Sequence, residues 1–549
     1  MIPTAEAKRR RGVLPALLVV GALIVGACGG DDSAGDSPVT TPTEVDEEPT
    51  DTTAAPDDND EVTAPEGDRD PNGVLRYAGP NPPSRMDPHL STLSQDNDKH
   101  FLVYDRLVHQ SPDGDPIPGL ALSWEFIEDG TILRMNLREG VEFHDGATFD
   151  AEAVKMNLER AKTIEGGTQA GDLGVITDVE VVDEFTVDLL VDGPAAALPL
   201  ILSDRAGAMI SPSAFDNPDL DEIAVGAGMY RVVSHNVGSL LVLERFENYW
   251  DPDAQGVATF EYHMLPDPAT RANAVQTGAV DWALINADSY DRLIAEDGLE
   301  GGLFDDLAYP NQPMNKAREA LAIVEVRQAL NHAIDRDALV NALARGYGIP
   351  CSQPWPQGYV AFNEEIGCDY YEYDPEKARQ LLTDAGYPDG FELELLNTPP
   401  DGTPRTEAVT SFLEDIGVTV TIRDLAPGTA GDVWLAQAQG DMLTGTWGGR
   451  PDAGQMLNLQ YGENGFLNPG KHRSDALEEI LVEVNDQRRS EEERGELLRE
   501  ATRISVEEAL DLVLYFPSLP NVWADKVVGA EAYLSGKQEF RGVYVRAES

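Results

Sequence analysis

The sequence has few cysteines, few basic residues and no long uninterrupted apolar run. Three cysteines in 549 residues exclude a disulfide-dense scaffold and a cysteine-rich zinc module. Only 40 lysines and arginines accompany 98 aspartates and glutamates, so the formal net charge is −58 at pH 7. A field of that sign repels phosphate backbones and anionic lipid headgroups, which argues against nucleic-acid binding.

Familiar catalytic motifs are also missing. The chain contains no H-E-x-x-H, G-x-S-x-G or C-x-x-C pattern. Residues 529–537 resemble a phosphate loop only faintly, and residues 251–262 begin like a calcium loop but end in Tyr262 where the closing glutamate would stand. The eight histidines show no ligand spacing, so we expect no metal and no cofactor. These absences favour a binding protein over an enzyme.

Enough apolar sequence is present for a large folded body. Hydrophobic residues make up 42% of the chain. Apolar alternation predicts strands at 133–137, 186–191 and 391–395, and Asp150 and Asp374 stand where N-caps of helices are expected. Residues 476–506 carry the pattern of two amphipathic helices. Strands and helices that interleave from about residue 74 onward indicate mixed α/β lobes.

The first 73 residues have the pattern of an export signal and a spacer. Basic residues 8–11 precede an apolar stretch at 13–27, which is shorter than the roughly 20 residues of a spanning helix. It ends in V-G-A-C, which resembles a bacterial lipobox: residues 1–27 would be removed and Cys28 lipidated, attaching the protein to the cell membrane. An ordinary signal peptide is the alternative, and export by the general or the twin-arginine route stays open. Residues 28–73 are acidic and lack aromatics, so we expect a disordered linker.

The two remaining cysteines predict a disulfide. Cys351 and Cys368 lie 17 residues apart in a stretch rich in proline, glycine and aromatics. An exported protein meets an oxidising environment, where such a pair is expected to oxidise. Two free thiols are the alternative.

Several motifs, taken in order, resemble the solute-binding proteins of ABC importers, in the dipeptide, oligopeptide and nickel-binding family called family 5. Each is weak alone, and together they cover about residues 74–549. They are P-S-R-M-D-P-H at 83–89, F-H-D-G-A-T-F-D-A-E-A-V-K at 143–155, G-A-G-M-Y at 226–230, E-R-F-E-N-Y-W at 244–250, V-R-Q-A-L at 326–330 with A-I-D-R at 333–336, and D-P-E-K-A-R-Q-L-L at 374–382 with A-G-Y at 385–387.

The resemblance implies a two-lobe, type II periplasmic-binding-protein-like α/β fold that closes on its ligand about a hinge. By this analogy lobe I comprises residues 74–312 and 510–549, with an extra subdomain at about 111–220, and lobe II comprises 313–509. The chain would cross twice between the lobes, which makes a hinge rather than a loose tether. The implied partners are a peptide or peptide-like solute and the permease and ATPase of the importer, and the protein is expected to be a monomer.

The ligand-binding residues are less regular. In peptide-binding relatives a tryptophan followed three residues later by an aspartate captures the α-ammonium of the ligand. Here Trp447 matches, and a position in the core is its alternative. Arg450 replaces the aspartate, and a guanidinium suits carboxylate or phosphate. Either Asp452 takes the ammonium, or the ligand presents an anionic group to Arg450, or Arg450 pairs with an acid of the protein itself. Tyr104 and Asn315 are further pocket candidates by position only.

Two functions of different classes follow from the sequence. The first is a membrane-tethered receptor that delivers a peptide-like solute to an ABC importer. The second is an exported hydrolase acting on peptides or sugars, which the missing nucleophile and metal motifs disfavour. A ligand sensor without a transport role is a third possibility.

Overall fold

The computed structural model describes residues 68–83, 85–400, 402–426 and 428–547. The predicted signal, Cys28 and the spacer up to residue 67 lie outside the described residues. The last residues of the predicted spacer belong to the folded body. Arg69 bridges to Arg546, its Nε donates to the carbonyl of Gly256 at 2.9 Å, and the Asp70 amide donates to the carbonyl of Val545 at 2.9 Å. The ordered chain therefore begins before Val74.

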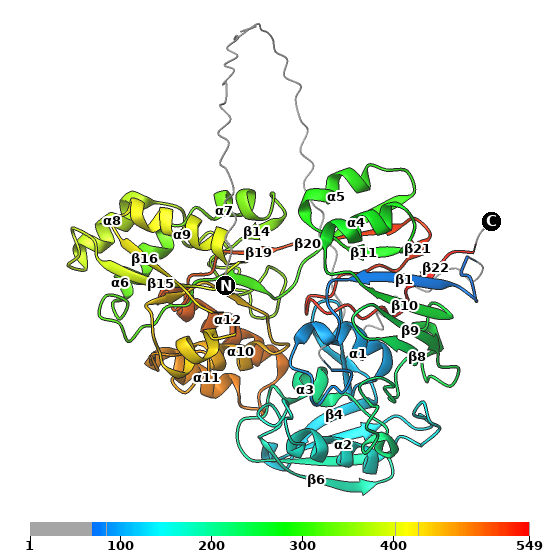
Figure 1. The fold of residues 1–549 in the computed structure, drawn as a ribbon. Helices are drawn as coiled ribbons and strands as arrows, with labels where there is room; N and C mark the ends of the chain where they lie inside the picture. Colours follow the sequence, from blue (N-terminus) through cyan, green and yellow to red (C-terminus); the bar gives the residue numbers. More distant parts are fainter. Residues whose placement is uncertain (1–67, 84, 401, 427, 548–549) are drawn as a thin grey trace, which may run out of the picture. The chain divides into compact units, whose positions relative to one another are not determined.

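Lobe I is built on a seven-stranded mixed sheet in the order β12-β20-β11-β1-β10-β9-β8 (Figure 1). Strand β1 pairs in parallel with β10 and β11, and the other neighbours are antiparallel. Aromatic rings fill the core beneath it, where Tyr77 meets Trp282 and Phe540 edge-on. The strands are β1 Val74–Gly79, β8 Tyr230–Asn236, β9 Leu240–Arg245, β10 Thr259–Met264, β11 Trp282–Leu284, β12 Leu299–Phe304 and β20 Leu519–Ala524, and the helices are α1 Asn97–Val103, α4 Pro268–Gln276 and α5 Ala287–Ile294.

The extra subdomain has its own sheet and core. Four antiparallel strands in the order β4-β5-β7-β6 carry helix α2 (cyan in Figure 1), around a separate cluster of buried side chains. The main elements are β4 Ala121–Ile127, β5 Ile132–Leu137, α2 Ala151–Thr163, β6 Ile176–Asp183, β7 Thr186–Val191 and α3 Leu198–Ile201, with the pair β2 Val108–Gln110 and β3 Pro116–Pro118 beside them.

Lobe II centres on three parallel strands in the order β16-β15-β17. Figure 1 draws most of its helices in yellow and orange. The strands are β15 Glu392–Asn397, β16 Thr419–Asp424 and β17 Met442–Leu443, and the helices are α6 Val324–His332, α7 Arg336–Leu343, α8 Pro375–Asp384, α9 Thr403–Asp415, α10 Ala453–Tyr461, α11 Asp475–Val484 and α12 Glu491–Glu507.

The segments that cross between the lobes pair with lobe II. Strand β13, Tyr309–Asn311, pairs with β18, Gly445–Trp447, and strand β19, Tyr515–Pro517, pairs with β14, Gly348–Pro350. The predicted boundaries at 312 and 510 assign both crossing strands to lobe I. By strand pairing lobe II extends from 309 to 517. The chain then ends on lobe I through the pair β21 Val527–Val528 and β22 Tyr544–Val545.

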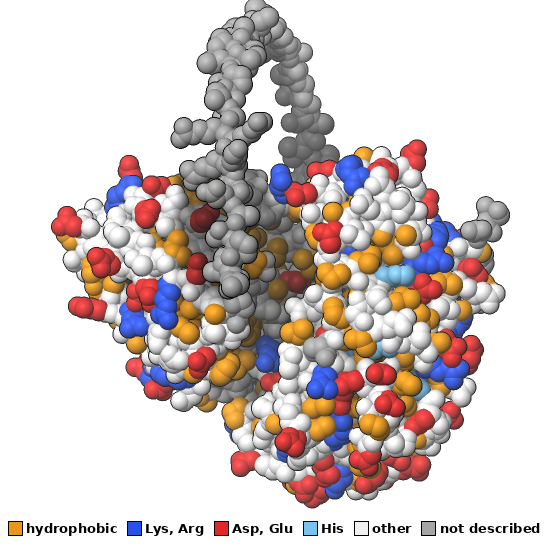
Figure 2. Space-filling model, in the orientation of Figure 1, with side chains coloured by type: hydrophobic (Ala, Val, Ile, Leu, Met, Phe, Trp, Pro, Cys, Tyr) orange, Lys and Arg blue, Asp and Glu red, His pale blue; other side chains and the backbone are white. Residues whose placement is uncertain are grey.

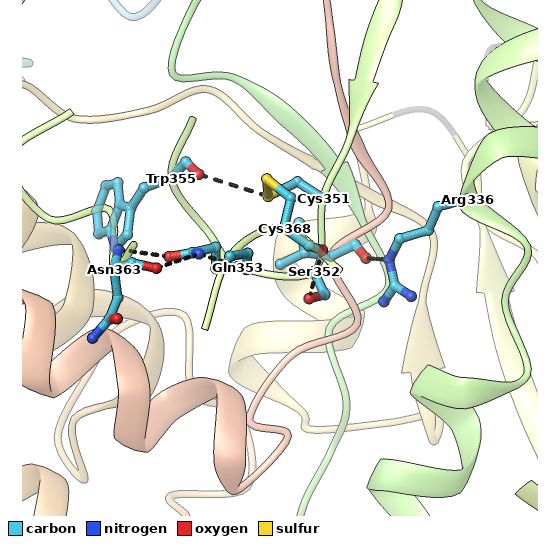
Figure 3. Close-up of a disulfide and its surroundings, with 9 residues drawn as sticks. Arg336, Cys351, Ser352, Gln353, Trp355, Asn363 and Cys368 are labelled. Carbon is cyan, nitrogen blue, oxygen red and sulfur yellow. Dashed lines mark hydrogen bonds between the residues drawn. A yellow bond between two sulfur atoms is a disulfide. The ribbon is translucent and has the colours of Figure 1, made fainter. Parts of the chain in front are cut away.

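Cys351 and Cys368 are disulfide-bonded in the structure (Figure 3). Neighbouring hydrogen bonds hold the same loop. The amide of Ser352 donates to the carbonyl of Cys368 at 2.9 Å, and the Gln353 amide group donates to the carbonyl of Gly367 at 2.7 Å. Trp355 Nε1 donates to Thr502 Oγ1 at 2.8 Å, which attaches the loop to helix α12.

Several local expectations are confirmed. Asp150 accepts the amide of Ala153 at 2.8 Å and caps α2, and Asp374 accepts the amide of Lys377 at 2.8 Å and caps α8. The predicted strands correspond to β5, β7 and β15, and the two predicted C-terminal helices are α11 and α12. Acidic side chains are scattered over the face shown in Figure 2, with lysines and arginines between them.

Candidate functional site

A first cavity of about 280 Å³ opens where the parallel strands of lobe I end. Pro80 and Asn81 follow β1 in its wall, and Leu284 ends β11. In sheets with parallel strands, ligands bind in the crevice outside the carboxyl ends of the strands. Part of the wall comes from segments distant in sequence: the crossing residues 305–308, Gly448 of lobe II and the tail residues 533–538.

Ionisable groups of both signs line this first cavity. Tyr262 donates its hydroxyl to Asp98 Oδ2 at 2.9 Å, and Lys99 Nζ lies 4.7 Å from the centroid of the Tyr262 ring while donating to the carbonyl of Gln95 at 2.9 Å. Burial raises the pKa of Asp306 to about 7, although its carboxylate accepts the amide of Ala308 at 2.6 Å. Such a wall suits a solute with charged or polar ends.

A second cavity of about 220 Å³ belongs to lobe II and its crossing segments. Trp447 lines the second cavity and Gly448, the next residue, lines the first, so the two cavities border neighbouring residues of the chain. Most of its wall is apolar, and the polar side chains are few. The apolar group includes Pro313, Met314, Trp434, Leu435, Leu443, Trp447 and Leu467, and the polar group is Asn311, Lys316, Thr446, Gln460, Tyr461 and Asp511.

The structure places the predicted Trp447 in the wall of the second cavity. Its strand β18 pairs with β13, which sets Trp447 opposite Tyr309. The indole Nε1 lies 2.8 Å from Met456 Sδ and donates to it, so the ring is fixed from helix α10. A half-buried, fixed indole is a suitable surface for stacking against a bound solute.

The predicted Arg450 forms an ion pair with an acid of the protein. Its Nη1 lies 3.0 Å from Asp172 Oδ2, and Gln455 Nε2 donates to Asp172 Oδ1 at 3.0 Å. Asp172 belongs to the extra subdomain, so this pair joins the subdomain to lobe II. Both side chains retain solvent exposure, 34% for Arg450 and 21% for Asp172. Arg450 lines neither of the two cavities described above.

Asp452 serves the protein's own structure. It is 1% exposed, accepts the amide of Gln455 at 2.8 Å as the N-cap of α10, and lies 2.8 Å from the guanidinium of Arg494. The carboxylate is thus engaged within the protein, and Asp452 lines neither of the two cavities described above.

The two candidates named by position are internal. Tyr104 is fully buried in the core of lobe I against the ring of His100. Asn315 donates to the carbonyls of Ala438 and Gly440 at 3.1 and 3.3 Å and accepts the amide of Ala317 at 3.2 Å. Neither lines the two cavities described above.

Little in the sequence marks the polar residues of the two cavities as candidates for ligand binding. Asp306 and Asp511 lie near the two predicted crossings, and that position is the clue that could have drawn attention to them. Gln460 and Lys316 lie within helical or loop sequence with no motif of their own.

Within residues 68–83, 85–400, 402–426 and 428–547, no group of three or more His, Cys, Asp or Glu side chains is placed to hold a metal ion. In those same ranges no helix combines the length and the apolar character needed to cross a membrane.

Comparison with known proteins shows which family has this architecture. Residues 115–468 match the family model of bacterial extracellular solute-binding proteins, family 5, middle region. A glutathione-binding protein GsiB from Pectobacterium atrosepticum is 32% identical over 353 residues, which cover 62% of this chain and 67% of the relative. The GsiB of Salmonella typhimurium is 33% identical over 353 residues, which cover 62% and 68%.

Solved structures agree on the fold. HbpA2 from Haemophilus parasuis superimposes with a TM-score of 0.78 at 22% identity, covering 86% of this chain and all of the other. The periplasmic binding protein DppA from Helicobacter pylori, in complex with the peptide STSA, has a TM-score of 0.72 at 24% identity and covers 87% and 98%. The expected type II periplasmic-binding-protein fold is thereby confirmed, and the chain belongs to the bacterial extracellular solute-binding proteins of family 5.

Proposed function

We propose that this protein is the solute receptor of an ABC importer and holds a peptide or peptide-like solute in the two cavities that border Trp447 and Gly448. The observation that carries the proposal is that neighbouring residues line both cavities. A charged cavity of lobe I and a largely apolar cavity of lobe II share one stretch of chain, so a solute with polar ends and a side chain can occupy both. Relatives named for glutathione and a fold shared with a peptide complex support the same class of ligand.

Delivery requires that the ligand favour a closed form. The chain passes between the lobes at residues 305–308 and again at about residue 518, and a double crossing acts as a hinge. A solute shifts the hinge only if it binds the closed form more tightly than the open one. The closed form would then present the surface that the permease and ATPase complex recognises.

Calorimetry on the purified protein tests the ligand class. We expect reduced glutathione, triglycine or the peptide Ser-Thr-Ser-Ala to bind with measurable heat and to be recovered intact by mass spectrometry. Recovery of cleaved peptide would support an exported hydrolase instead. Binding of intact peptide without any uptake defect in cells lacking the gene would support a sensor.

We also propose that Cys28 carries a lipid that holds the protein, as a monomer, on the extracytoplasmic face of the cell membrane. The V-G-A-C sequence at 25–28 supports this, and its apolar stretch is too short for a permanent span. Cys28→Ser is expected to release the protein from the membrane fraction into the soluble one. Retention of the variant in the membrane fraction would contradict lipidation.

A further inference from the structure

The floor of the second cavity carries two opposite charges. Lys316 is buried and donates to the carbonyls of Leu510 at 3.0 Å and Met314 at 3.4 Å. Asp511 is also buried and accepts Asn311 Nδ2 at 2.7 Å and the amide of Leu512 at 2.8 Å. Because one cation and one anion share the floor, it has no net preference for a charged group. Both ions already have partners from the protein.

Gln460 brings an unused donor to the same cavity. Its side chain is 7% exposed, and its Oε1 accepts the hydroxyl of Tyr309 at 3.2 Å. Its Nε2 has no hydrogen-bond partner among the described residues. A buried donor without a partner is unfavourable, and an acceptor atom on a ligand would relieve it.

The wall residues and the volume of the cavity indicate which ligand group it can hold. Trp434, Trp447 and Tyr461 supply aromatic faces, and Leu435, Leu443 and Leu467 complete the apolar lining. At about 220 Å³ the cavity is smaller than the roughly 300 Å³ or more of pockets that hold a whole small ligand. It suits one side chain of a larger solute whose remainder lies in the first cavity.

We infer that the second cavity is the subsite for one large uncharged side chain of the bound peptide, with an aromatic ring that ends in a hydroxyl, as in tyrosine, fitting best. This inference rests on the proposed function. The ring would stack on the tryptophan walls, and the hydroxyl oxygen would accept from Gln460 Nε2. A charged side chain would lose its hydration among apolar walls and would meet one attractive and one repulsive charge on the floor.

A peptide series measures this preference. Triglycine is compared by calorimetry with tripeptides in which Phe, Tyr, Lys or Glu replaces each glycine in turn. At one position we expect Phe to bind at least tenfold more tightly than Gly, Tyr several-fold more tightly than Phe, and Lys and Glu more weakly than Phe.

Two substitutions assign the preference to this cavity. Gly431 lines the second cavity, and a Cβ there would meet no atom from other parts of the chain within 4 Å, so Gly431→Leu can be accommodated and is expected to reduce the space open to a ligand. It is expected to weaken the Phe and Tyr peptides at least tenfold more than triglycine. Gly171→Leu, at a similarly open position outside both cavities, is the matched control. Gln460→Met is expected to abolish the advantage of Tyr over Phe.

The outcomes separate this inference from the proposed function. Peptides that bind without any preference for a large side chain, or a preference that survives Gly431→Leu, would overturn the subsite and leave the receptor role intact. A protein that binds no peptide of the series would overturn both. Thermal unfolding of each variant establishes that a lost affinity does not reflect lost folding.

Discussion

The two lobes hold the returning C-terminal part of the chain with buried arginines, but in different ways. In lobe I, Arg106 makes a two-pronged ion pair with Glu539, at 2.9 and 2.5 Å, with both side chains almost fully buried. In lobe II, Arg327 donates to the carbonyls of Glu508 and Ala509 at 2.6–3.1 Å and to those of Leu321 and Ala322 at 3.0 and 3.1 Å.

The difference concerns what can replace each arginine. An ion pair between two side chains can be exchanged for two apolar side chains, since both charges leave together. Main-chain carbonyls cannot be removed, so an arginine that serves them has no apolar substitute. This gives the V-R-Q-A-L motif a structural meaning: its arginine fastens the segment after α12, from which the chain returns to lobe I.

Arg327→Met is expected to have the largest effect on stability. Four carbonyls lose their donor, and the loss should reach about 5 kcal/mol of unfolding free energy. Guanidinium chloride unfolding measures it. Arg345→Met is the matched control, because Arg345 is 65% exposed in an ion pair with Asp288 and should change stability little. Equal effects of the two substitutions would contradict the role of Arg327.

Glu539→Ala is expected to cost about 4 kcal/mol, because it leaves the buried Arg106 without its carboxylate. The double variant Arg106→Met with Glu539→Leu should recover most of that loss. No such rescue exists for Arg327. A double variant as unstable as Glu539→Ala alone would remove the distinction between the two lobes.

Opening the disulfide is expected to cost lobe II about 3 kcal/mol, since the cross-link closes a loop with a sequence separation of 17 residues. Cys351→Ser with Cys368→Ser should lower the unfolding midpoint accordingly. Alkylation with and without reductant, read by mass spectrometry, checks that the bond forms. Two labelled thiols before reduction would contradict it.

Asp306, at the first crossing, should make stability depend on pH. Burial raises its pKa in the folded chain to about 7, above the ordinary value of 3.8. Between these values the folded protein retains a proton that the unfolded chain has lost, so stability falls as the pH rises from about 4 to about 7. Asp306→Asn should reduce the loss between pH 5 and pH 8 by on the order of 2 kcal/mol. Asp475→Asn, at a side chain that is 86% exposed, controls for net charge.

Arg450→Ala should change stability least, by less than about 1 kcal/mol, because its pair with Asp172 is partly exposed. Its effect on binding discriminates between the predicted roles. If an anionic ligand displaces Asp172, the variant binds glutathione more weakly by about 1.5–3 kcal/mol. Asp172→Asn would then strengthen binding, since the guanidinium is freed. Unchanged affinity in both variants would remove Arg450 from the site.

Local sequence rules predicted the helices, the strands and their mixed α/β class, and the resemblance to family 5 supplied the two-lobe fold. Capping aspartates such as Asp150 and Asp374 act within one turn of helix, so the sequence alone is sufficient to find them. Trp447 was proposed from the family motif; it lines the second cavity, and its role in binding stays a prediction. The polar floor of the second cavity was not predictable, because Asn311, Gln460 and Asp511 meet only through tertiary structure.

Asp452 is an example of a residue whose role can be interpreted in two ways from the sequence. An aspartate near a motif tryptophan can bind an ammonium, and an aspartate just before a helix can cap it. The structure uses the second, and Arg494, 42 residues away, completes its neutralisation. Burial of the Asp452 side chain favours the capping role. This burial depends on tertiary packing, which cannot be deduced from the spacing of residues along the sequence.

The bridge between Arg69 and Arg546 has a mechanical consequence. Residues 68–70 are hydrogen-bonded to the C-terminal residues 545–547 and to Gly256, all of which belong to lobe I. If the protein is attached to the membrane through Cys28, as proposed above, the attachment would reach the folded body through lobe I. Movement of lobe II about the two crossing segments would then be independent of that attachment.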